Sequence, residues 1–159
     1  MLFSPKPQTG KRHAWMVGVL LLLVTFSCMA QTLPLAKVWK DPSCGCCEDW
    51  IAHLKAAGFK VQTFDTGNAD ARARLGIPRK YGSCHTAEIG GYAIEGHVPA
   101  ADIKRLLKEA PKGVVGLAVP GMVIGSPGMD GAAYGGRKEP YDVLLINKDG
   151  SSRVYQSYR

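Results

Sequence analysis

The chain has little that points to nucleic acid, because it contains no basic run with interleaved aromatic residues, the pattern of a nucleic-acid groove. The net charge is +7, from 20 Lys and Arg against 13 Asp and Glu. Three of these bases, Lys6, Lys11 and Arg12, lie among the first 30 residues, which contain no acid. Without them, 17 scattered bases face 13 acids, and the net charge falls to +4. We therefore expect no nucleic-acid partner.

The chain also lacks the features of a disordered, fibrous or repetitive protein. Charged residues make up only 21% of it and hydrophobic residues 46%, which is unlike a disordered chain. The 19 glycines and 10 prolines predict many turns but follow no collagen-like period. A length of 159 residues without internal repeats suits one ordinary domain.

A long hydrophobic run is missing as well. The run Ala14–Phe26 has 13 residues, too few for a stable span of a ~30 Å hydrocarbon core. It follows the N-terminal bases and precedes small residues that end at Ala30, as in a secretory signal peptide. We expect residues 1–30 to be cleaved, leaving residues 31–159 in an exported compartment with no stable membrane insertion. A retained anchor and lipid attachment at Cys28 are the alternatives.

The mature chain alternates strand and helix patterns. Residues that alternate between apolar and polar predict strands, and apolar residues at helical spacing predict helices. The predicted strands are Ala36–Lys40, Phe59–Phe64, Ser83–Ile89 and Tyr92–Ile94, and the predicted helices are Glu48–Ala57, Asn68–Leu75 and Pro99–Ala110. The order β-α-β-α-β-β-α is that of a thioredoxin-like α/β fold.

The segment from Lys112 to Tyr134 differs from the rest in its content of glycine, proline and methionine. Apolar residues interspersed along it predict a long ordered loop or functional flap instead of a linker. After it, Asp142–Asn147 and Ser152–Gln156 flank a Lys-Asp-Gly turn and predict a β-hairpin. The predicted fold is thus thioredoxin-like, with a Gly/Pro/Met-rich loop and a C-terminal β-hairpin extension.

Three cysteines stand within four residues where the first predicted strand leads into the first helix. Cys44 and Cys47 have CxxC spacing, and Cys46 lies between them. Unpaired N–H groups at a helix N-terminus favour thiolates, which attack disulfides and bind soft metals such as Cu(I). A structural disulfide is the alternative, and the four cysteines of the mature chain allow three pairings.

The sequence Ser83-Cys84-His85-Thr86 opens the third predicted strand, where a thioredoxin-like fold approaches the cysteines of the first helix. We expect Cys84 to meet those cysteines, either to resolve a disulfide or to complete a metal site. His85 is a candidate ligand if a strand end or bulge lets it and Cys84 face one ion. His97, in a loop before the last predicted helix, is a second candidate ligand.

Met122 and Met129 are the only methionines of the mature chain, and each follows a glycine in the Gly/Pro-rich segment. A methionine commonly fills gaps in a hydrophobic core. In an exported chain with several cysteines, we expect these two to act as thioether donors to a soft metal.

These segments together resemble the CopG-type periplasmic copper-resistance proteins, a family long catalogued as a domain of unknown function. The resemblance runs from about Lys37 to the C-terminus and departs at Val123-Ile124, where the family commonly has a proline after the first Gly-Met. It rests on several motifs in one order: DPSCGCC at 41–47, SCHTA at 83–87, GGYAIEGHVPAADIKRLL at 90–107, GLAVPGM at 116–122, GSPGM at 125–129 and YDVLL at 141–145.

The resemblance implies a thioredoxin-like fold, export to the periplasm and copper bound as a multinuclear cluster. It also implies a redox role, between Cu(I) and Cu(II) or through the thiols, and other periplasmic copper-resistance proteins as partners. The ligands carried over by position are Cys44, Cys46, Cys47, Cys84, His85, His97, Met122 and Met129.

Three functions stay open at this point. The favoured one is a periplasmic copper-binding protein of copper resistance, which holds copper ions at the CGCC motif and the accompanying Cys and His residues. The alternative is a metal-free thiol–disulfide oxidoreductase, in which Cys44 attacks and Cys47 or Cys84 resolves. A zinc-binding or structural module is the third. Whether copper turnover or thiol chemistry at Cys44 and Cys47 makes the protein an enzyme also stays open.

Overall fold

The computed structural model describes residues 32–159 together with Met1 and Ser4. The predicted signal peptide and its cleavage site lie outside the described residues, apart from those two. None of the helices described has the length and hydropathy that a membrane span requires.

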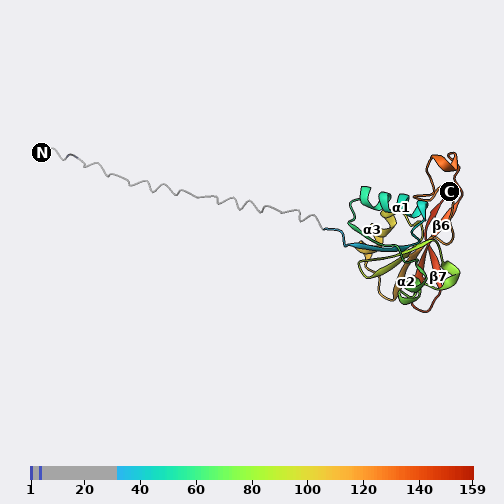
Figure 1. Cartoon of the computed structure of the whole chain (residues 1–159). Coiled ribbons are helices and arrows are strands. Elements are labelled where there is room, and N and C mark those ends of the chain that lie inside the picture. The colour runs from blue at the N-terminus through green and yellow to red at the C-terminus, as the bar shows by residue number, and fades with distance from the viewer. Residues whose placement is uncertain (2–3, 5–31) are drawn as a thin grey trace. The chain divides into compact units, whose positions relative to one another are not determined.

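Residues 32–159 form a mixed α/β structure with one seven-stranded sheet (Figure 1). Its strands are β1 (Ala36–Lys40), β2 (Val61–Phe64), β3 (His85–Ile89), β4 (Tyr92–Glu95), β5 (Val114–Ala118), β6 (Tyr141–Asn147) and β7 (Ser152–Tyr158). Its helices are α1 (Gly45–Ala56), α2 (Ala69–Arg74) and α3 (Ala100–Glu109), with short 3-10 turns η1 (Arg79–Tyr81) and η2 (Ala132–Tyr134).

The strands follow the order β2-β1-β3-β4-β5-β6-β7 across the sheet. The pairs β1–β2 and β4–β5 are parallel, and the other four neighbouring pairs are antiparallel. The α/β prediction is confirmed. The parallel β1-α1-β2 unit, followed by α2, the β3–β4 hairpin and α3, has the order predicted for a thioredoxin-like arrangement.

The prediction of one long loop between Lys112 and Tyr134 is wrong over its first part, because β5 lies within it and joins the sheet between β4 and β6. The strand contains Gly116, and a Cβ there would collide with the Ala93 carbonyl of β4. The close approach of the two strands explains why the position is glycine. Gly116 is also one of the six glycines that make residues 112–134 resemble a loop in composition.

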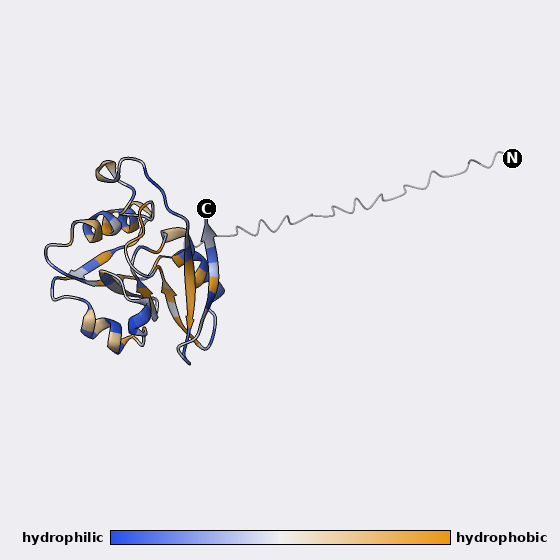
Figure 2. Ribbon diagram, turned by 90° about the vertical axis from the view of Figure 1, so that its right-hand side faces the viewer, coloured by the Kyte–Doolittle hydropathy of each residue, from blue (hydrophilic) through white to orange (hydrophobic). Residues whose placement is uncertain are grey.

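Hydrophobic side chains fill both faces of the sheet. The main core packs α1 and α3 against one face through residues such as Trp50, Leu54 and Ile103. A smaller core on the other face lies beside α2 and η1 and includes Ile77 and Tyr81. Figure 1 shows α1 and α3 on one side of the sheet and α2 on the other, and Figure 2 shows hydrophobic residues along the central strands. Lys40 at the end of β1 pairs with His85 at the start of β3, so the segment that precedes β3 lies beside the turn between β1 and α1.

Candidate metal centre

A tight turn between β1 and α1 sets the position of the first cysteine. The Asp41 carboxylate accepts hydrogen bonds from the N–H group (2.9 Å) and the hydroxyl (2.6 Å) of Ser43. The Cys44 N–H donates to the Asp41 carbonyl (3.1 Å), and Cys44 is the N-cap residue of α1. An aspartate that binds the backbone two residues on is a common way to fix such a turn.

The helix α1 begins at Gly45, three residues before the predicted Glu48, so Cys46 and Cys47 lie in its first turn. The N–H groups of that turn have no partner within the helix. Cys47 forms a disulfide with Cys44, which decides the pairing that the sequence left open. Cys46 stays outside the disulfide as a free thiol.

Cys84 meets the helix cysteines, as predicted. Its sulfur lies 3.9 Å from the Cys46 sulfur, which in turn lies 3.6 Å from the Cys44 sulfur. The Cys84 carbonyl oxygen lies 3.8 Å from the Cys47 sulfur. All four cysteines of the described chain therefore gather at the N-terminal end of α1.

The two candidate histidines also lie close to the Cys84 sulfur. Cys84 Sγ is 3.4 Å from His85 Nδ1 and 3.2 Å from His97 Nε2. The strand β3 begins at His85, so Cys84 stands just outside the regular alternation of side chains. This is the strand end that the sequence required if the two neighbours were to face one ion.

The six side chains fall into two donor sets that share Cys84. In each set, the possible ligand atoms all lie within 4.8 Å of one another. The first set is Cys44, Cys46, Cys47 and Cys84, and the second is Cys84, His85 and His97. We call these six residues the ligand cluster. Thiolate and imidazole donors fit soft and borderline metals, including Cu(I), Cu(II) and Zn(II).

The ring of His97 is held in the tautomer that suits a ligand. Its Nδ1 lies 2.8 Å from the Pro127 carbonyl oxygen, which can only accept a hydrogen bond. Nδ1 therefore carries the proton, and Nε2 presents its lone pair towards Cys84. Burial lowers the pKa of His97, so the ring is neutral at neutral pH.

His85 is enclosed on the core side of the cluster. Its ring centroid lies 4.2 Å from that of Trp50, whose indole N–H donates to the Val98 carbonyl (2.9 Å). Burial, with a smaller effect of His97, lowers the pKa of His85 well below its ordinary value of 6.5. Within the described chain, His85 Nε2 has no hydrogen-bond partner. A buried polar nitrogen without a partner is costly, and the nitrogen of His85 that faces Cys84 is the other one, Nδ1.

The pKa of the Cys84 thiol depends on burial and on nearby charges. Burial, and next the neighbouring Cys46, raises the pKa of the Cys84 thiol to about 12. Cys84 is therefore a neutral thiol at neutral pH in the protein alone. A bound cation reverses this balance, because its charge favours the thiolate.

The two loop methionines differ in their surroundings. Met122 is 58% exposed, whereas Met129 is buried and its sulfur accepts a hydrogen bond from the Tyr134 hydroxyl (3.2 Å). The loop itself reaches the ligand cluster through its backbone: Gly121 accepts a hydrogen bond from the Ser83 hydroxyl, next to Cys84. Ligation by either methionine remains a prediction.

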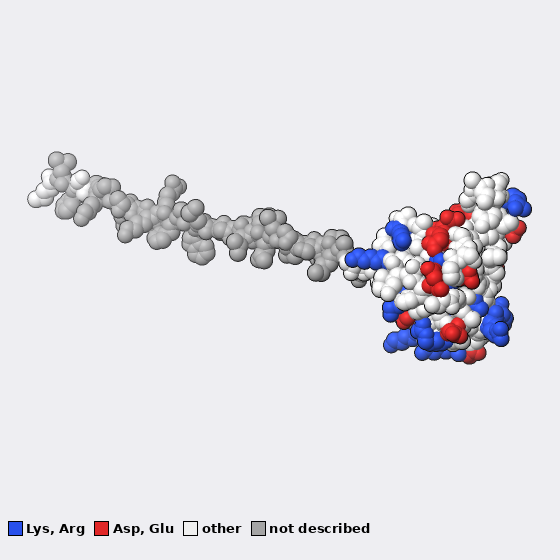
Figure 3. All heavy atoms as spheres, viewed as in Figure 1, with Lys and Arg blue, Asp and Glu red and all other residues white. Residues whose placement is uncertain are grey.

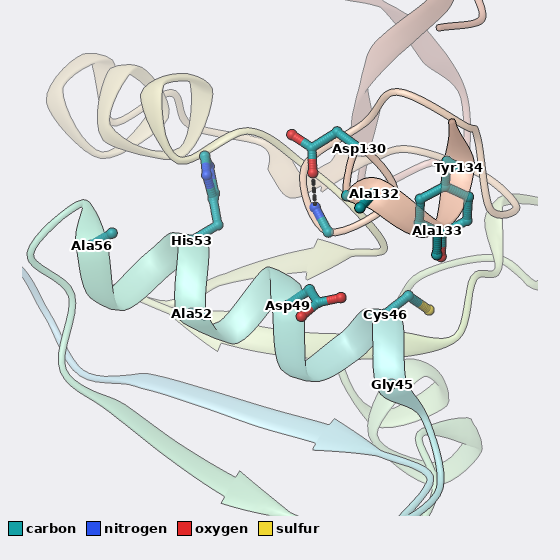
Figure 4. Close-up of a pocket in the computed structure, with 12 residues that line it drawn as sticks. Gly45, Cys46, Asp49, Ala52, His53, Ala56, Asp130, Ala132, Ala133 and Tyr134 are labelled. Atoms are coloured by element: carbon teal, nitrogen blue, oxygen red, sulfur yellow. Dashed lines mark hydrogen bonds between the residues drawn. The ribbon is translucent and has the colours of Figure 1, made fainter. Parts of the chain in front are cut away.

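A groove of about 780 Å³ runs along the exposed face of α1 and ends at Cys46 (Figure 4). Asp49 and His53 line it from the helix, and Asp130 and Tyr134 line it from the facing loop. None of its described lining residues is Lys or Arg. The groove therefore brings two carboxylates and the Cys46 residue into one open, acidic lining.

Charge is unevenly distributed over the surface. Figure 3 shows acidic residues gathered in the middle of one face and basic residues along its lower edge, the side where Figure 1 places α2. The carboxylates of Glu48 and Asp65 are exposed and both accept from the buried ammonium group of Lys40, at 2.7 Å each.

Sequence reasoning missed two buried charged residues beside the ligand cluster. Lys40 ends β1 and is 1% exposed, and Glu95 ends β4 and is fully buried. Glu95 pairs with Arg72 of α2, with a separation of 2.8 Å. The available signal was a charged residue at the end of a strand, close in sequence to a candidate ligand.

Comparisons with known proteins identify related chains. Residues 81–129, which include Cys84, His85 and His97, match a family described as "Protein of unknown function, DUF411". No curated protein matches the chain. Two solved structures, "Copper resistance protein copG- Form 1" and "Form 2", each share 45% sequence identity with it at a TM-score of 0.71. Each alignment covers 79% of this chain and 98% of the other.

Proposed function

The chain belongs to the CopG family of copper resistance proteins, and from that premise we propose that it binds more than one copper ion at the ligand cluster in the periplasm. The signal-like pattern of residues 1–30 supports export. Copper bound in that compartment would be withdrawn from harmful reactions, and other periplasmic copper-resistance proteins would be its exchange partners.

One observation carries the proposal: a single sulfur, that of Cys84, belongs to both donor sets. Thiolate sulfur can bridge two soft metal ions. One ion would be bound on the side of Cys46, and a second on the side of His85 and His97. Thiolates favour Cu(I) and imidazoles accept both oxidation states, so mixed ligation suits copper that changes its oxidation state.

The disulfide adds a redox step to this proposal. When Cys44 and Cys47 are both thiols, they can give one electron to each of two Cu(II) ions. Both S–H bonds then break, the S–S bond seen in the structure forms, two protons leave to solvent, and two Cu(I) ions remain. An external dithiol restores the thiols by exchange and becomes a disulfide itself.

A second candidate function is thiol–disulfide exchange without metal. It is favoured by the Cys44–Cys47 disulfide at the N-terminal end of α1, where the helix favours a thiolate leaving group. In this alternative, Cys84 and the histidines would have no metal-binding role. The copper function therefore requires Cys84 as a metal ligand, whereas thiol–disulfide exchange does not require it to bind metal.

Elemental analysis of the purified protein separates the candidates. The full chain is produced in a bacterium that can export it, with copper supplied, and purified without chelators. We expect more than one copper per chain, and N-terminal sequencing to show a mature chain that starts at Gln31. Negligible metal together with rapid reduction of a model disulfide would favour the oxidoreductase, and zinc alone would contradict both.

A further inference from the structure

A buried polar network lies directly behind Cys84, on the face of the sheet that carries α2. Glu95, at the end of β4, is fully buried. Its Oε1 accepts from Arg72 Nε (2.8 Å) and from the Ser83 N–H (2.6 Å), and its Oε2 accepts from the Thr86 hydroxyl (2.6 Å). A buried carboxylate with three donors is well satisfied, so this network is ordered and specific.

The network holds Ser83 by its backbone. Its N–H is bound by Glu95, and its carbonyl accepts from Arg72 and from the Asn68 amide (3.1 Å). That carbonyl belongs to the peptide bond that leads into Cys84. The planes of both peptide bonds of Ser83 are therefore fixed by residues from α2 and β4.

The residue after Cys84 is fixed as well. His85 pairs with Lys40 in the antiparallel ladder between β1 and β3, and its carbonyl accepts from the Gly96 N–H (3.0 Å). Cys84 thus lies between two anchored neighbours. Its sulfur is directed to the α1 side of the sheet, towards Cys46, whereas the network holds the chain from the α2 side.

The segment Glu95-Gly96-His97 links the network to a ligand. Gly96 has a φ of +69°, and a Cβ there would lie 2.5 Å from the Val119 carbonyl oxygen and 2.6 Å from the Ser83 Cβ. The turn at this glycine lets Glu95 bind Arg72 on one face while His97 contacts Cys84 on the other. The Arg72–Glu95 pair therefore influences the positions of Cys84 and His97, two members of the second donor set.

We propose that Arg72 and Glu95 are positioning residues of the copper site: they hold Ser83 and the Gly96 turn so that Cys84 and His97 meet at one ion. The inference rests on the proposed copper function, because it assigns these two residues a role in that site. Neither residue belongs to the ligand cluster. Partners of this kind orient metal ligands and commonly contribute about 10- to 100-fold to metal affinity.

The chain offers a matched control on the same elements. Arg74 of α2 and Glu88 of β3 form a wider, partly exposed ion pair, with 4.0 Å between the charged groups. The test compares Glu95→Gln and Arg72→Lys with Glu88→Gln and Arg74→Lys. Lysine keeps the charge at 72 but cannot bind Glu95 and the Ser83 carbonyl with two nitrogens as arginine does.

Each full-chain variant is loaded with Cu(I) anaerobically, in a phosphine reductant that keeps every cysteine as a thiol. Affinity is measured by competition with a coloured Cu(I) chelator, and the copper–thiolate ultraviolet absorption is recorded. We expect Glu95→Gln to weaken Cu(I) binding by about 10- to 100-fold and to change that spectrum. Arg72→Lys should do so less strongly, and both controls should match the wild-type protein.

A purely structural role gives a different result. If Glu95→Gln lowers the melting temperature but its folded form binds Cu(I) with wild-type affinity and spectrum, the positioning role is overturned. If Glu95→Gln does not fold, Arg72→Lys decides by the same comparison. Failure of the wild-type protein to bind Cu(I) would contradict the proposed function itself, and would be seen before any variant is measured.

Discussion

Cys84 and His97 lie 13 residues apart in the sequence, and their Sγ and Nε2 atoms are 3.2 Å apart in the structure. The Pro127 carbonyl fixes the proton of His97 on its other nitrogen, so the contact joins a thiol and an imidazole lone pair. A thiol and a lone pair at this separation can share a proton or, once the thiol is ionised, a metal ion. In the proposed function, the two groups share a metal ion.

Replacing Cys84 should affect copper binding more than replacing any other single ligand, because only Cys84 belongs to both donor sets. We expect Cys84→Ser to lower the copper content to one ion per chain or fewer. His85→Ala removes a donor from one set only and should leave the sulfur set able to bind. Native mass spectrometry of the copper-loaded proteins measures the number of ions directly, and equal losses in both variants would contradict a shared ligand.

The copper capacity should depend on the Cys44–Cys47 disulfide. In the disulfide form, two of the four sulfurs cannot act as thiolates, and Cys46, Cys84 and the two histidines remain. We expect the oxidised protein to bind fewer Cu(I) ions than the reduced protein. The double variant Cys44→Ser/Cys47→Ser should bind the lower number whether or not reductant is present. A capacity that is the same in both redox states of the wild-type protein would show that these two sulfurs bind no copper.

Much of the fold follows from local patterns in the sequence. β1 was predicted to the residue, and α3 and β4 to within one residue at each end, because apolar spacing and the flanking glycines and prolines mark these elements. β5 escaped because its glycine is required by contact with β4, and that contact is visible only in three dimensions. The start of α1 was placed too late because its N-terminal turn is made of cysteine and glycine, which carry little helical signal.

The ligand cluster was predictable for a different reason. Cys84 and the CGCC motif are 37 residues apart at their closest, and their meeting followed from the predicted strand order. The hydrogen-bond network behind the cluster did not follow from the sequence, because the partners of Glu95 come from α2, from Ser83 just before β3 and from Thr86 of β3. Pairing between a helix and a strand of this kind depends on the path of the chain, which residue spacing does not give.

The stability of the metal-free protein should fall as the pH drops below about 6.5, and part of the fall should come from His53. The ring Nε2 accepts a hydrogen bond from the Ala100 N–H at the start of α3 (3.0 Å). Burial lowers the pKa of His53 below its ordinary value of 6.5, against a smaller opposing effect of Asp130. The unfolded chain therefore takes up the proton first, so the stabilisation is present above pH 6.5 and is lost as the pH falls.

The variant His53→Gln isolates this contribution, since a glutamine oxygen can accept the same hydrogen bond and does not titrate. We expect the variant to lose less stability than the wild-type protein between pH 7 and 5, by about 1 kcal/mol, the usual contribution of a helix cap. Urea unfolding of the metal-free proteins at each pH measures it. His85 and His97 are present in both proteins, so parallel pH profiles would contradict the role of His53.

The acidic lining of the groove should speed copper loading without setting the final affinity. Asp49 and Asp130 line the same groove as Cys46, and no basic residue is among the described residues that line it. We expect Asp49→Asn/Asp130→Asn to slow the loading of Cu(II) by about 2- to 10-fold at low salt, and the difference to shrink as salt screens the charges. Stopped-flow measurements at several salt concentrations test this, with Asp149→Asn on the distant β6–β7 turn as the control.

Gly128 lets the loop that carries Met129 pack closely against α1, because a side chain at this position would collide with the helix backbone. A Cβ there would lie 2.7 Å from both the Cys46 carbonyl oxygen and the Trp50 backbone nitrogen, and the residue has a φ of +84°. Gly128→Ala should therefore destabilise the protein by about 1–3 kcal/mol, since neither the helix backbone nor the strained alanine can relax freely. Gly131→Ala, in the same loop with nothing within 4 Å of its Cβ, is the matched control. Urea unfolding measures the difference in stability between the two variants. The displaced loop also carries the Pro127 carbonyl bound to His97. Of the two variants, only Gly128→Ala should therefore weaken copper binding.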